Sequence, residues 1–238
     1  LSEFVGARED AGIEFDKGKV SGRSLFLIDG KNADAYLLAN KSGELFLIDS
    51  SNKGITVTEL VTVDKTRTSI ELILDKVDAT LLPGSSDISV IEKVLDAGRL
   101  MLSADTVGAS QVMLDKAVAY SLERKQFGRL IGSFQAVKHM CAEMAAELEP
   151  CHSMIWHAAH SQDSSAEDAR LMACQTKAHV SEVGKQVSKT ATEVHGGMGF
   201  TDELGLHYWF KRIGLNRQLL GSPELIREEA GKLQGFDQ

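Results

Sequence analysis

The sequence contains little cysteine and little proline, and it lacks any long apolar run. Its 238 residues include three cysteines and three prolines. No two cysteines form a C-x-x-C pair, and their odd number favours reduced thiols in a cytoplasmic setting over a disulfide framework. No apolar run approaches the length of a membrane span and no signal peptide is evident, so we expect no membrane partner. No Met opens the chain, which begins at Leu1, and we therefore expect a fragment or a processed product.

Basic residues are outnumbered by acidic ones. Lys and Arg total 26, Asp and Glu total 34, and the formal net charge is −8. A chain with this balance binds polyanions poorly, so we expect no nucleic-acid partner. A phosphorylated ligand can still bind through a few local arginines. His157-x-x-His160 has one-turn spacing but no evident third ligand, so we predict no metal site.

Short apolar segments separated by turn-rich pieces fill the first third of the chain. They are Ser24–Ile28, Ala35–Ala39, Glu44–Ile48, Ile55–Leu60 and Ser69–Leu74. The pieces between them contain the Gly, Asn and Asp residues that favour turns. Strands at this spacing, with no helical pattern between them, predict an antiparallel sheet or small barrel over residues 1–83.

The period of the apolar residues becomes helical beyond Leu82-Pro-Gly-Ser-Ser86, which we take as the domain boundary. The pattern predicts long helices at about 88–124, 133–162 and 165–195, and shorter ones at about 202–219 and 223–234. Together they predict an up-down four-helix bundle over residues 87–238, its fourth helix made of the shorter pieces, and an α+β fold for the chain. Two apolar stripes should face each other in its core: Val137, Met140, Cys141, Met144, Ala145 and Leu148, and Val180, Val183, Val187, Ala191 and Val194.

A first motif, Glu123-Arg-Lys-Gln-Phe-Gly128, lies between two predicted helices and precedes Ile131-Gly-Ser-Phe-Gln-Ala-Val137. One interpretation is purely local: Gly128 ends one helix and Ser133 caps the next. A guanidinium beside an aromatic ring and two amides also makes a cradle for a phosphate and a flat ring. The residues of that cradle are Arg124, Gln126, Phe127 and Gln135.

A second motif, Glu193-Val-His-Gly-Gly-Met-Gly-Phe-Thr201, follows a predicted helix. Its glycines let a ligand or a neighbouring chain approach the backbone closely. The same residues also suit a flexible turn, with Thr201 capping the next helix. No strand precedes the motif and a third glycine is missing, so it is not a Rossmann fingerprint.

Together the two motifs resemble a known family. Arg124-Lys-Gln-Phe-Gly128 with Ser133-Phe-Gln135, followed by His195-Gly-Gly-Met-Gly-Phe-Thr201, is similar to the C-terminal signatures of FAD-dependent acyl-CoA dehydrogenases. Gly22–Asp34 resembles the G-x-K-x-W-I-T-N-G-x-x-A-D segment of their middle β domain, and Leu1-Ser-Glu3 resembles part of their T-E-P segment. The resemblance spans nearly the whole chain and lacks only the family's N-terminal helical domain.

The resemblance implies FAD as cofactor and names the residues around it. Those that would line the FAD of a neighbouring subunit are Arg124, Gln126, Phe127, Ile131, Phe134, Gln135 and Val137. Gly196 and Gly197 would lie at the pyrophosphate, with Glu193 where the family usually has Gln. A carboxylate beside phosphates is unfavourable unless a cation intervenes. Phe26 and Ile28 replace the Trp and Thr that the family places beside the flavin ring.

The resemblance also implies an acyl-CoA substrate and a catalytic carboxylate. That carboxylate takes the α-proton of the thioester while a hydride leaves the β-carbon for the flavin. The family places it at one of two positions, which Leu220 and Gly98 occupy here, so the base is unknown. The helix positions that touch acyl-CoA in the family are Leu95, Asp96 and Arg99. Carboxylates that could serve as a relocated base are Asp96, Asp105, Glu203 and Glu224.

Three interpretations of function remain open. The chain is a base-lacking subunit of a heteromeric acyl-CoA dehydrogenase in fatty-acid or steroid side-chain metabolism, a homomeric dehydrogenase or related flavoenzyme with a relocated base, or a non-catalytic acyl-CoA- or FAD-binding scaffold. The resemblance implies a homo-oligomer or a heterotetramer with a paralogous subunit, and electron-transfer flavoprotein as electron acceptor. Turnover separates the second interpretation from the third, and a co-purifying paralogous chain would favour the first.

Overall fold

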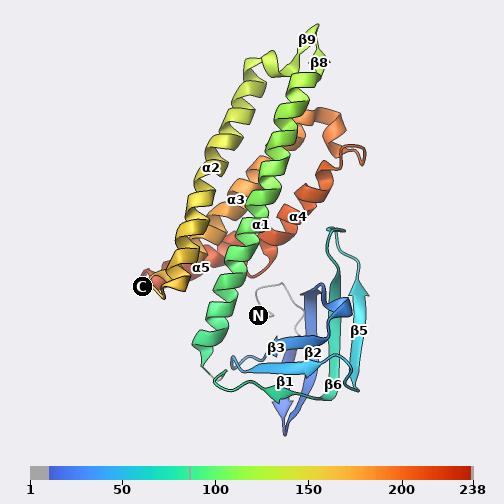
Figure 1. Ribbon diagram of the computed structural model, residues 1–238, viewed down its shortest axis with the longest axis vertical. Coiled ribbons are helices and arrows are strands. Elements are labelled where there is room, and N and C mark those ends of the chain that lie inside the picture. The colour runs from blue at the N-terminus through green and yellow to red at the C-terminus, as the bar shows by residue number, and fades with distance from the viewer. Residues whose placement is uncertain (1–10, 86, 237–238) are drawn as a thin grey trace. The chain divides into compact units, whose positions relative to one another are not determined.

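The computed structural model describes residues 11–85 and 87–236 of the chain. It has two compact units, the first ending at Leu95 and the second beginning at Asp96. Strands make up most of the first unit and helices most of the second (Figure 1). The segment Leu1-Ser-Glu3 lies outside the described residues. Within them, no helix has the length and apolar composition needed to cross a membrane, and no His, Cys, Asp and Glu side chains cluster as metal ligands.

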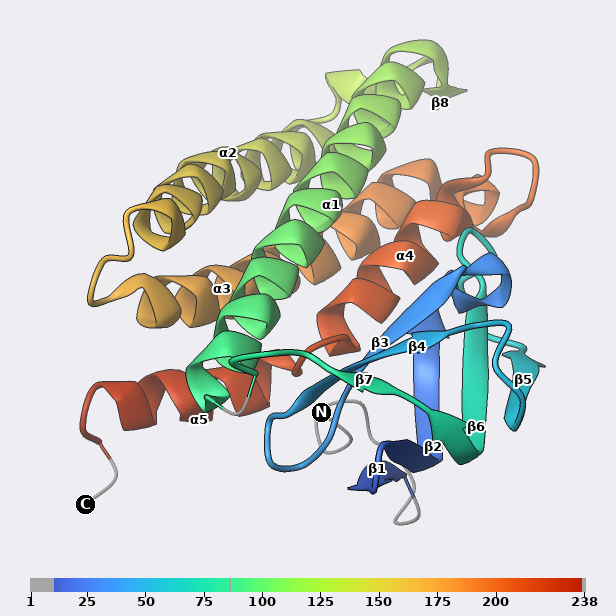
Figure 2. The same ribbon diagram turned by 60° about the horizontal axis from the view of Figure 1, so that its bottom comes forward.

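The first unit contains two antiparallel sheets, which Figure 2 shows with their strands in different directions. The larger sheet has the order β1-β2-β6-β5, with β1 (Gly12–Asp16), β2 (Lys19–Ile28), β6 (Ser69–Asp78) and β5 (Ile55–Leu60). The smaller has the order β3-β4-β7, with β3 (Ala35–Ala39), β4 (Leu45–Asp49) and β7 (Thr80–Leu81). Among the described residues neither sheet closes on itself. Antiparallel sheets, and not a barrel, are therefore what the strand pattern produces.

Side chains from both sheets form one apolar core. The strands alternate inward and outward side chains, which is why the short apolar segments suffice to fill it. The core residues with no exposed surface are Val20, Phe46, Ile48, Ile70, Leu72 and Val77. The buried Tyr36 hydroxyl donates a hydrogen bond to the Gly30 carbonyl (3.1 Å), in the short helix η2 (Gly30–Asn32). All five predicted strand segments lie in or on strands, whereas β1 and the two-residue β7 were not predicted.

The second unit consists of helices, the first of which begins in the first unit. They are α1 (Ile88–Glu123), α2 (Gln135–Asp163), α3 (Ala169–His195), α4 (Leu206–Gln218) and α5 (Pro223–Leu233). Between α1 and α2 lie β8 (Lys125–Gln126), β9 (Arg129–Leu130) and the short helix η3 (Ile131–Ser133). The short helix η4 (Gly196–Phe200) follows α3. These bounds agree closely with the predicted helices.

The two apolar stripes predicted for α2 and α3 pack into one core, which confirms that prediction. Buried members of this core come from α1, α2, α3 and α4, and include Met113, Met144, Leu148, Val180, Val187, Ala191 and Ile213. Ala145 is exposed, because it lies on the outer side of α2 next to the buried Met144. The last helix is separate: α5 packs on α3 through Ile226 and Ala230 against Cys174 and Ala178. Four helices thus contribute to the main core and α5 lies outside it, so the predicted bundle, with the two shorter helices together as its fourth helix, is not confirmed.

Candidate functional site

The first motif forms a β-hairpin between α1 and α2. β8 pairs with β9, and the two turn residues Phe127 and Gly128 have φ of 52° and 78°. A two-residue turn with positive φ at both positions matches the natural twist of a hairpin. The predicted helix cap at Gly128 is therefore wrong, because α1 has already ended at Glu123.

Ser133 is not the N-cap of α2 either, because the short helix η3 intervenes between the hairpin and α2. The N-cap is Phe134, which makes no side-chain capping bond. The Ser133 hydroxyl instead donates to the Leu130 carbonyl (2.7 Å). This bond closes η3, so the serine shapes the connection that follows the hairpin.

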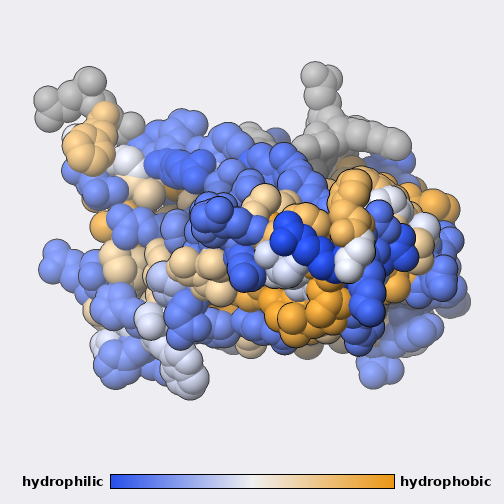
Figure 3. All heavy atoms as spheres, turned by 90° about the horizontal axis from the view of Figure 1, so that it is seen from above, coloured by the Kyte–Doolittle hydropathy of each residue, from blue (hydrophilic) through white to orange (hydrophobic). Residues whose placement is uncertain are grey.

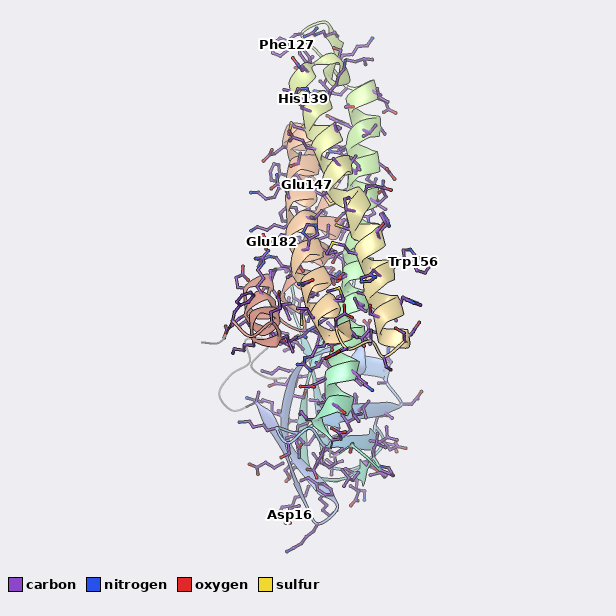
Figure 4. The ribbon with its side chains drawn as sticks, turned by 90° about the vertical axis from the view of Figure 1, so that its left-hand side faces the viewer. Asp16, Phe127, His139, Glu147, Trp156 and Glu182 are labelled. Carbon is purple, nitrogen blue, oxygen red and sulfur yellow. The ribbon has the colours of Figure 1, made fainter. Side chains whose placement is uncertain are left out.

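The hairpin presents polar and aromatic side chains to solvent. Phe127 is 92% exposed and lies at the far end of the long helices (Figure 4). Its ring meets Phe134 edge-on at 6.3 Å, and the Arg129 guanidinium lies 3.9 Å from the Phe134 ring centre. An exposed ring offers a flat apolar surface on which a ligand or partner can pack. The other exposed side chains of the predicted cradle are Arg124, Gln126 and Gln135, whereas Ile131, Phe134 and Val137 are half-buried.

The second motif forms η4, and its three glycines serve different purposes. A Cβ on Gly199 would lie 2.6 Å from the Thr192 carbonyl oxygen, so packing requires glycine there. A Cβ on Gly196 or Gly197 would meet no atom within 4 Å. The backbone at these two glycines is therefore open to an incoming group. Thr201 does not cap α4 as predicted; its hydroxyl donates to the Met198 carbonyl (2.8 Å), and the N-cap of α4 is Gly205.

Tyr120 brings the two motifs to the same end of the helical unit. Its ring stacks on His195 at 4.6 Å, and its carbonyl accepts the Arg124 backbone N–H at 2.9 Å. Nδ1 of His195 lies 2.7 Å from the Ala191 carbonyl, and burial lowers the pKa of the imidazole. His195 is thus a neutral packing residue. Figure 3, which views the molecule from this end, shows apolar surface interrupted by hydrophilic side chains.

The exposed groups at this end fit a dinucleotide cofactor. Among the described residues, no side chain forms an ion pair or hydrogen bond with the Arg124 guanidinium, so it can meet an anion. Open glycine backbone lets a pyrophosphate approach, and exposed rings offer a flat apolar surface. Glu193 is also exposed, on the last turn of α3, and is the one carboxylate of the predicted set.

Phe26 and Ile28 lie in the first unit, on β2. Phe26 has φ of 57°, which is rare for a residue with a side chain, and it is 37% exposed. It lies where the pairing of β2 with β6 is irregular, between Ser24 and Leu27. Such bulges commonly redirect a side chain, and residues held in sparsely populated conformations cluster at functional sites. Ile28 is half-buried and pairs with Ser69 on β6.

The two residues predicted to stand at the family's base positions are neighbours in space. A Cβ on Gly98 would lie 2.5 Å from Cδ1 of Leu220, so the leucine side chain fills the space beside the glycine. Leu220 has φ of 57°, in the left-handed region. Its carbonyl accepts a hydrogen bond from Nε of Arg99 (3.2 Å). The two positions therefore form one apolar surface, where α1 meets the connection between α4 and α5.

A buried network of charged side chains adjoins Leu220, because Arg99 belongs to it. Arg99 is 1% exposed and makes two hydrogen bonds with Glu229, at 2.7 and 3.1 Å, and one with Asp96 at 3.0 Å. Arg170 also donates to Glu229 (2.6 Å). Burial raises the pKa of Asp96, whereas for Glu229 the bonds and charges of the two arginines outweigh burial and lower the pKa. The network joins α1, α3 and α5.

Leu95, Asp96 and Arg99, predicted to touch acyl-CoA, lie on α1 with different exposure. Leu95 is half-buried, and Asp96 is buried with Arg99 in the network. Arg170 and Glu229 were not predicted to belong to any site. No local pattern could have identified them, because α3 and α5 bring them to Arg99 from distant parts of the chain.

Comparisons with known proteins show which family the chain is similar to. Residues 88–233 match the family description "Acyl-CoA dehydrogenase, C-terminal domain". Acyl-CoA dehydrogenase FadE34 of Mycobacterium tuberculosis is 30% identical over 227 residues, 94% of this chain and 31% of that protein. The caffeyl-CoA reductase-Etf complex subunit CarC of Acetobacterium woodii is 38% identical over 111 residues, 47% of this chain and 29% of that protein. The chain spans about a third of the length of these two relatives.

A solved structure, the Tcur3481-Tcur3483 steroid ACAD variant, superimposes with a TM-score of 0.86 at 26% identity, over 98% of this chain and 64% of that one. With the family match over more than half of the sequence, these similarities identify the chain. It belongs to the acyl-CoA dehydrogenase family. Members of this family are FAD-dependent flavoprotein oxidoreductases.

Proposed function

We propose that the chain is a subunit of an FAD-dependent acyl-CoA dehydrogenase assembly in which it completes a shared flavin site while a paralogous subunit supplies the catalytic carboxylate. When bound, FAD would accept the hydride from the β-carbon of the thioester. The residues proposed to hold it are those of the hairpin end, chiefly Arg124 with the open backbone of Gly196 and Gly197. Glu193 would lie near the same phosphates, so a neighbouring cation is needed to offset its charge.

One observation supports the proposal: Leu220 and Gly98, which stand at the two positions predicted for the base, lie against each other, and neither is a carboxylate. A hydrocarbon side chain takes no proton, and the α-proton needs a base within hydrogen-bond reach. The base must then come from a different residue or from a different chain.

A base relocated within this chain is the second candidate, and the contacts of the nearby carboxylates oppose it. Asp96 is buried against Arg99, and Asp105 accepts a 2.6 Å bond from Asn216 and pairs with Arg212. Hydrogen bonds from Ser222, from its own backbone and from Arg217 lower the pKa of Glu224 to about 2, which makes it a weak base. The remaining carboxylate that could serve as a relocated base is Glu203, which is exposed.

The names of the relatives support a multi-subunit assembly. CarC is a subunit of a complex with Etf, and the Tcur3481-Tcur3483 protein is named as a steroid ACAD with two components. We therefore propose electron-transfer flavoprotein as the electron acceptor and a fatty-acyl or steroid side-chain CoA thioester as the substrate. Leu95 would contact the acyl group, and the buried residues Asp96 and Arg99 would hold this part of α1 in place.

The experiment that tests this proposal compares the chain with and without its partner. The chain purified alone should show no acyl-CoA-dependent reduction of an artificial electron acceptor. The assembly purified with a paralogous chain should show turnover, and replacing the partner's glutamate by glutamine should abolish it. Robust turnover by the unmodified chain alone would refute the proposal and favour a relocated base.

Assembly gives a separate prediction. The hairpin residues serve a neighbour's flavin in the proposed arrangement, so the chain should not be a monomer. We expect a dimer or a dimer of dimers, alone or with its paralogue. Sedimentation of the native protein at micromolar concentration measures this directly, and a stable monomer would contradict it.

Arg124→Ala is expected to weaken flavin retention. The proposed charge-assisted bonds to the pyrophosphate contribute about 1.5–3 kcal/mol, which corresponds to roughly a tenfold to hundredfold weaker FAD affinity. The measurement is flavin absorbance per assembly after dialysis. Arg227→Ala, which removes an exposed arginine from α5, is the matched control and should retain its flavin. Equal flavin content in both variants would show that Arg124 does not bind the cofactor.

A further inference from the structure

Lys177, on α3, is a buried lysine that the proposed reaction does not use. It is 1% exposed. Its Nζ donates to the Asn216 carbonyl at 2.7 Å and to the Arg217 carbonyl at 3.4 Å, and lies 3.1 Å from the Ser181 hydroxyl. Asn216 and Arg217 belong to the last turn of α4, where carbonyl groups lack intrahelical partners. From the interior of the helical unit, the lysine thus donates hydrogen bonds to carbonyl groups at the end of α4 that have no partner within the helix.

The surroundings of Lys177 are unusual for a cation. Among the described residues, no carboxylate accepts a hydrogen bond from Nζ. Burial, the charge of Arg99 on α1 and the charge of Arg217 on α4 lower the pKa of Lys177 to about 7. The carboxylates around these two arginines are already bonded to them: Asp96 and Glu229 to Arg99, and Glu182 and Glu224 to Arg217.

Both protonation states of Lys177 can satisfy this site. The charged amine has three hydrogens for the two carbonyl groups and the Ser181 oxygen. The neutral amine has two hydrogens for the carbonyl groups, and its lone pair can accept the hydroxyl hydrogen of Ser181. The contacts to α4 therefore survive deprotonation, so the lysine can hold the helix end throughout the physiological pH range.

The helix end that Lys177 holds leads directly to Leu220. The connection from α4 to α5 passes through Leu219, which is buried, and Leu220, whose backbone is in the left-handed region. Arg99 holds the Leu220 carbonyl from α1, and Lys177 holds the preceding turn from α3. Two buried basic side chains thus fix the connection from two different helices.

We propose that Lys177 is a positioning residue that fixes the end of α4 and so sets where residue 220 lies against Gly98. The proposal has a structural part, which stands on the contacts of Nζ. Its catalytic part rests on the proposed function, because position 220 matters for reaction only if this surface adjoins the acyl thioester.

Hydrogen–deuterium exchange of the native assembly tests the structural part. Lys177→Met keeps the length and apolar stem of the side chain but removes the donors, so backbone amides of residues 217–222 should exchange at least about tenfold faster. Lys189→Met, about three turns further along α3 at an exposed position, is the matched control and should leave these amides unchanged. Equal exchange in the two variants would overturn the proposal.

Ser181→Ala provides a second variant in case Lys177→Met does not fold. It keeps the lysine and removes the third partner of Nζ, so exchange at residues 217–222 should rise by a smaller factor. No increase in Ser181→Ala, together with unfolding of Lys177→Met, would show that the lysine supports the whole helical unit and does not position the connection specifically.

The pH dependence of unfolding distinguishes positioning by a titrating lysine from simple packing. Between about pH 7 and 10.5 the unfolded lysine keeps a proton that the folded protein has released, so stability gains from rising pH in this window. Relative to Lys177→Met, the folding equilibrium constant of the unmodified protein should rise by up to about tenfold per pH unit. If the ratio of the two folding equilibrium constants stays constant across this window, Lys177 keeps its proton in the folded protein and is not a neutral amine there.

A double variant tests the catalytic part separately. Leu220→Glu is expected to restore turnover in an assembly whose partner lacks its glutamate. Adding Lys177→Met should remove most of that restored rate while flavin content stays unchanged. If the exchange results hold but the restored rate is unaffected, the positioning does not reach the acyl site. If Leu220→Glu restores nothing, position 220 does not adjoin the α-carbon, the catalytic part of the proposal is overturned, and the exchange result still decides the structural role of Lys177.

Discussion

Leu220→Glu is expected to raise the rate of acyl-CoA dehydrogenation by about 10²–10⁴-fold in a complete, flavin-loaded assembly whose paralogous partner carries glutamine in place of its glutamate. The change supplies the missing proton acceptor at a half-buried position whose carbonyl Arg99 already holds. The measurement is the steady-state rate of acceptor reduction, together with flavin content and circular dichroism to show that the assembly is intact.

Leu220→Gln is the matched control, because it has the same shape as Glu and cannot take the proton. A glutamate variant no faster than the glutamine variant would show that position 220 does not adjoin the α-carbon. Gly98→Glu should not substitute for it, because a side chain at 98 would collide with Leu220, whose Cδ1 lies 2.5 Å from the required Cβ. Activity in Gly98→Glu alone would contradict the geometry described for the two positions.

Arg99→Met is expected to lower the free energy of unfolding by about 3–5 kcal/mol. The change removes the 3.0 Å bond of Arg99 to the buried Asp96 and leaves Glu229 with only the bond from Arg170. Removing one partner of a buried ion pair costs more stability than the intact pair contributes, because the remaining charge stays desolvated. Urea unfolding followed by circular dichroism measures the loss.

Arg227→Met, on the exposed side of α5, serves as the control for Arg99→Met and should change stability by less than about 0.5 kcal/mol. Adding Glu229→Leu to Arg99→Met should recover part of the loss, because one of the two carboxylates that lost Arg99 is then removed. A loss below about 1 kcal/mol in Arg99→Met would mean that water reaches the network and that Arg99 does not hold the helices together.

The helices and strands could be predicted because each has a regular period of apolar residues. Val180, Val187 and Ala191 recur at helical spacing and are buried in one core. The connections were predicted less well, because backbone conformation decides them. The hairpin depends on positive φ at Phe127, and a phenylalanine gives no signal for that conformation.

The exposed residues of the candidate site could be predicted because their motifs resemble those of a family. The contacts of the buried charged network could not. Arg124 and Gly197 stand in recognisable segments, whereas Arg99 and Glu229 are 130 positions apart in the sequence. Lys177 did leave a signal: it lies one helical turn before Val180, on the apolar stripe of α3. A charged residue within a buried stripe needs partners, and here the partners are the carbonyl groups of a different helix.

Native mass spectrometry of the assembly purified from its source tests the central claim most directly. The account predicts a complex that contains this chain, a paralogous chain with a glutamate at a family base position, and bound FAD. A homomeric complex, or a complex that never carries flavin, would contradict the claim that the chain completes a flavin site whose base belongs to another subunit.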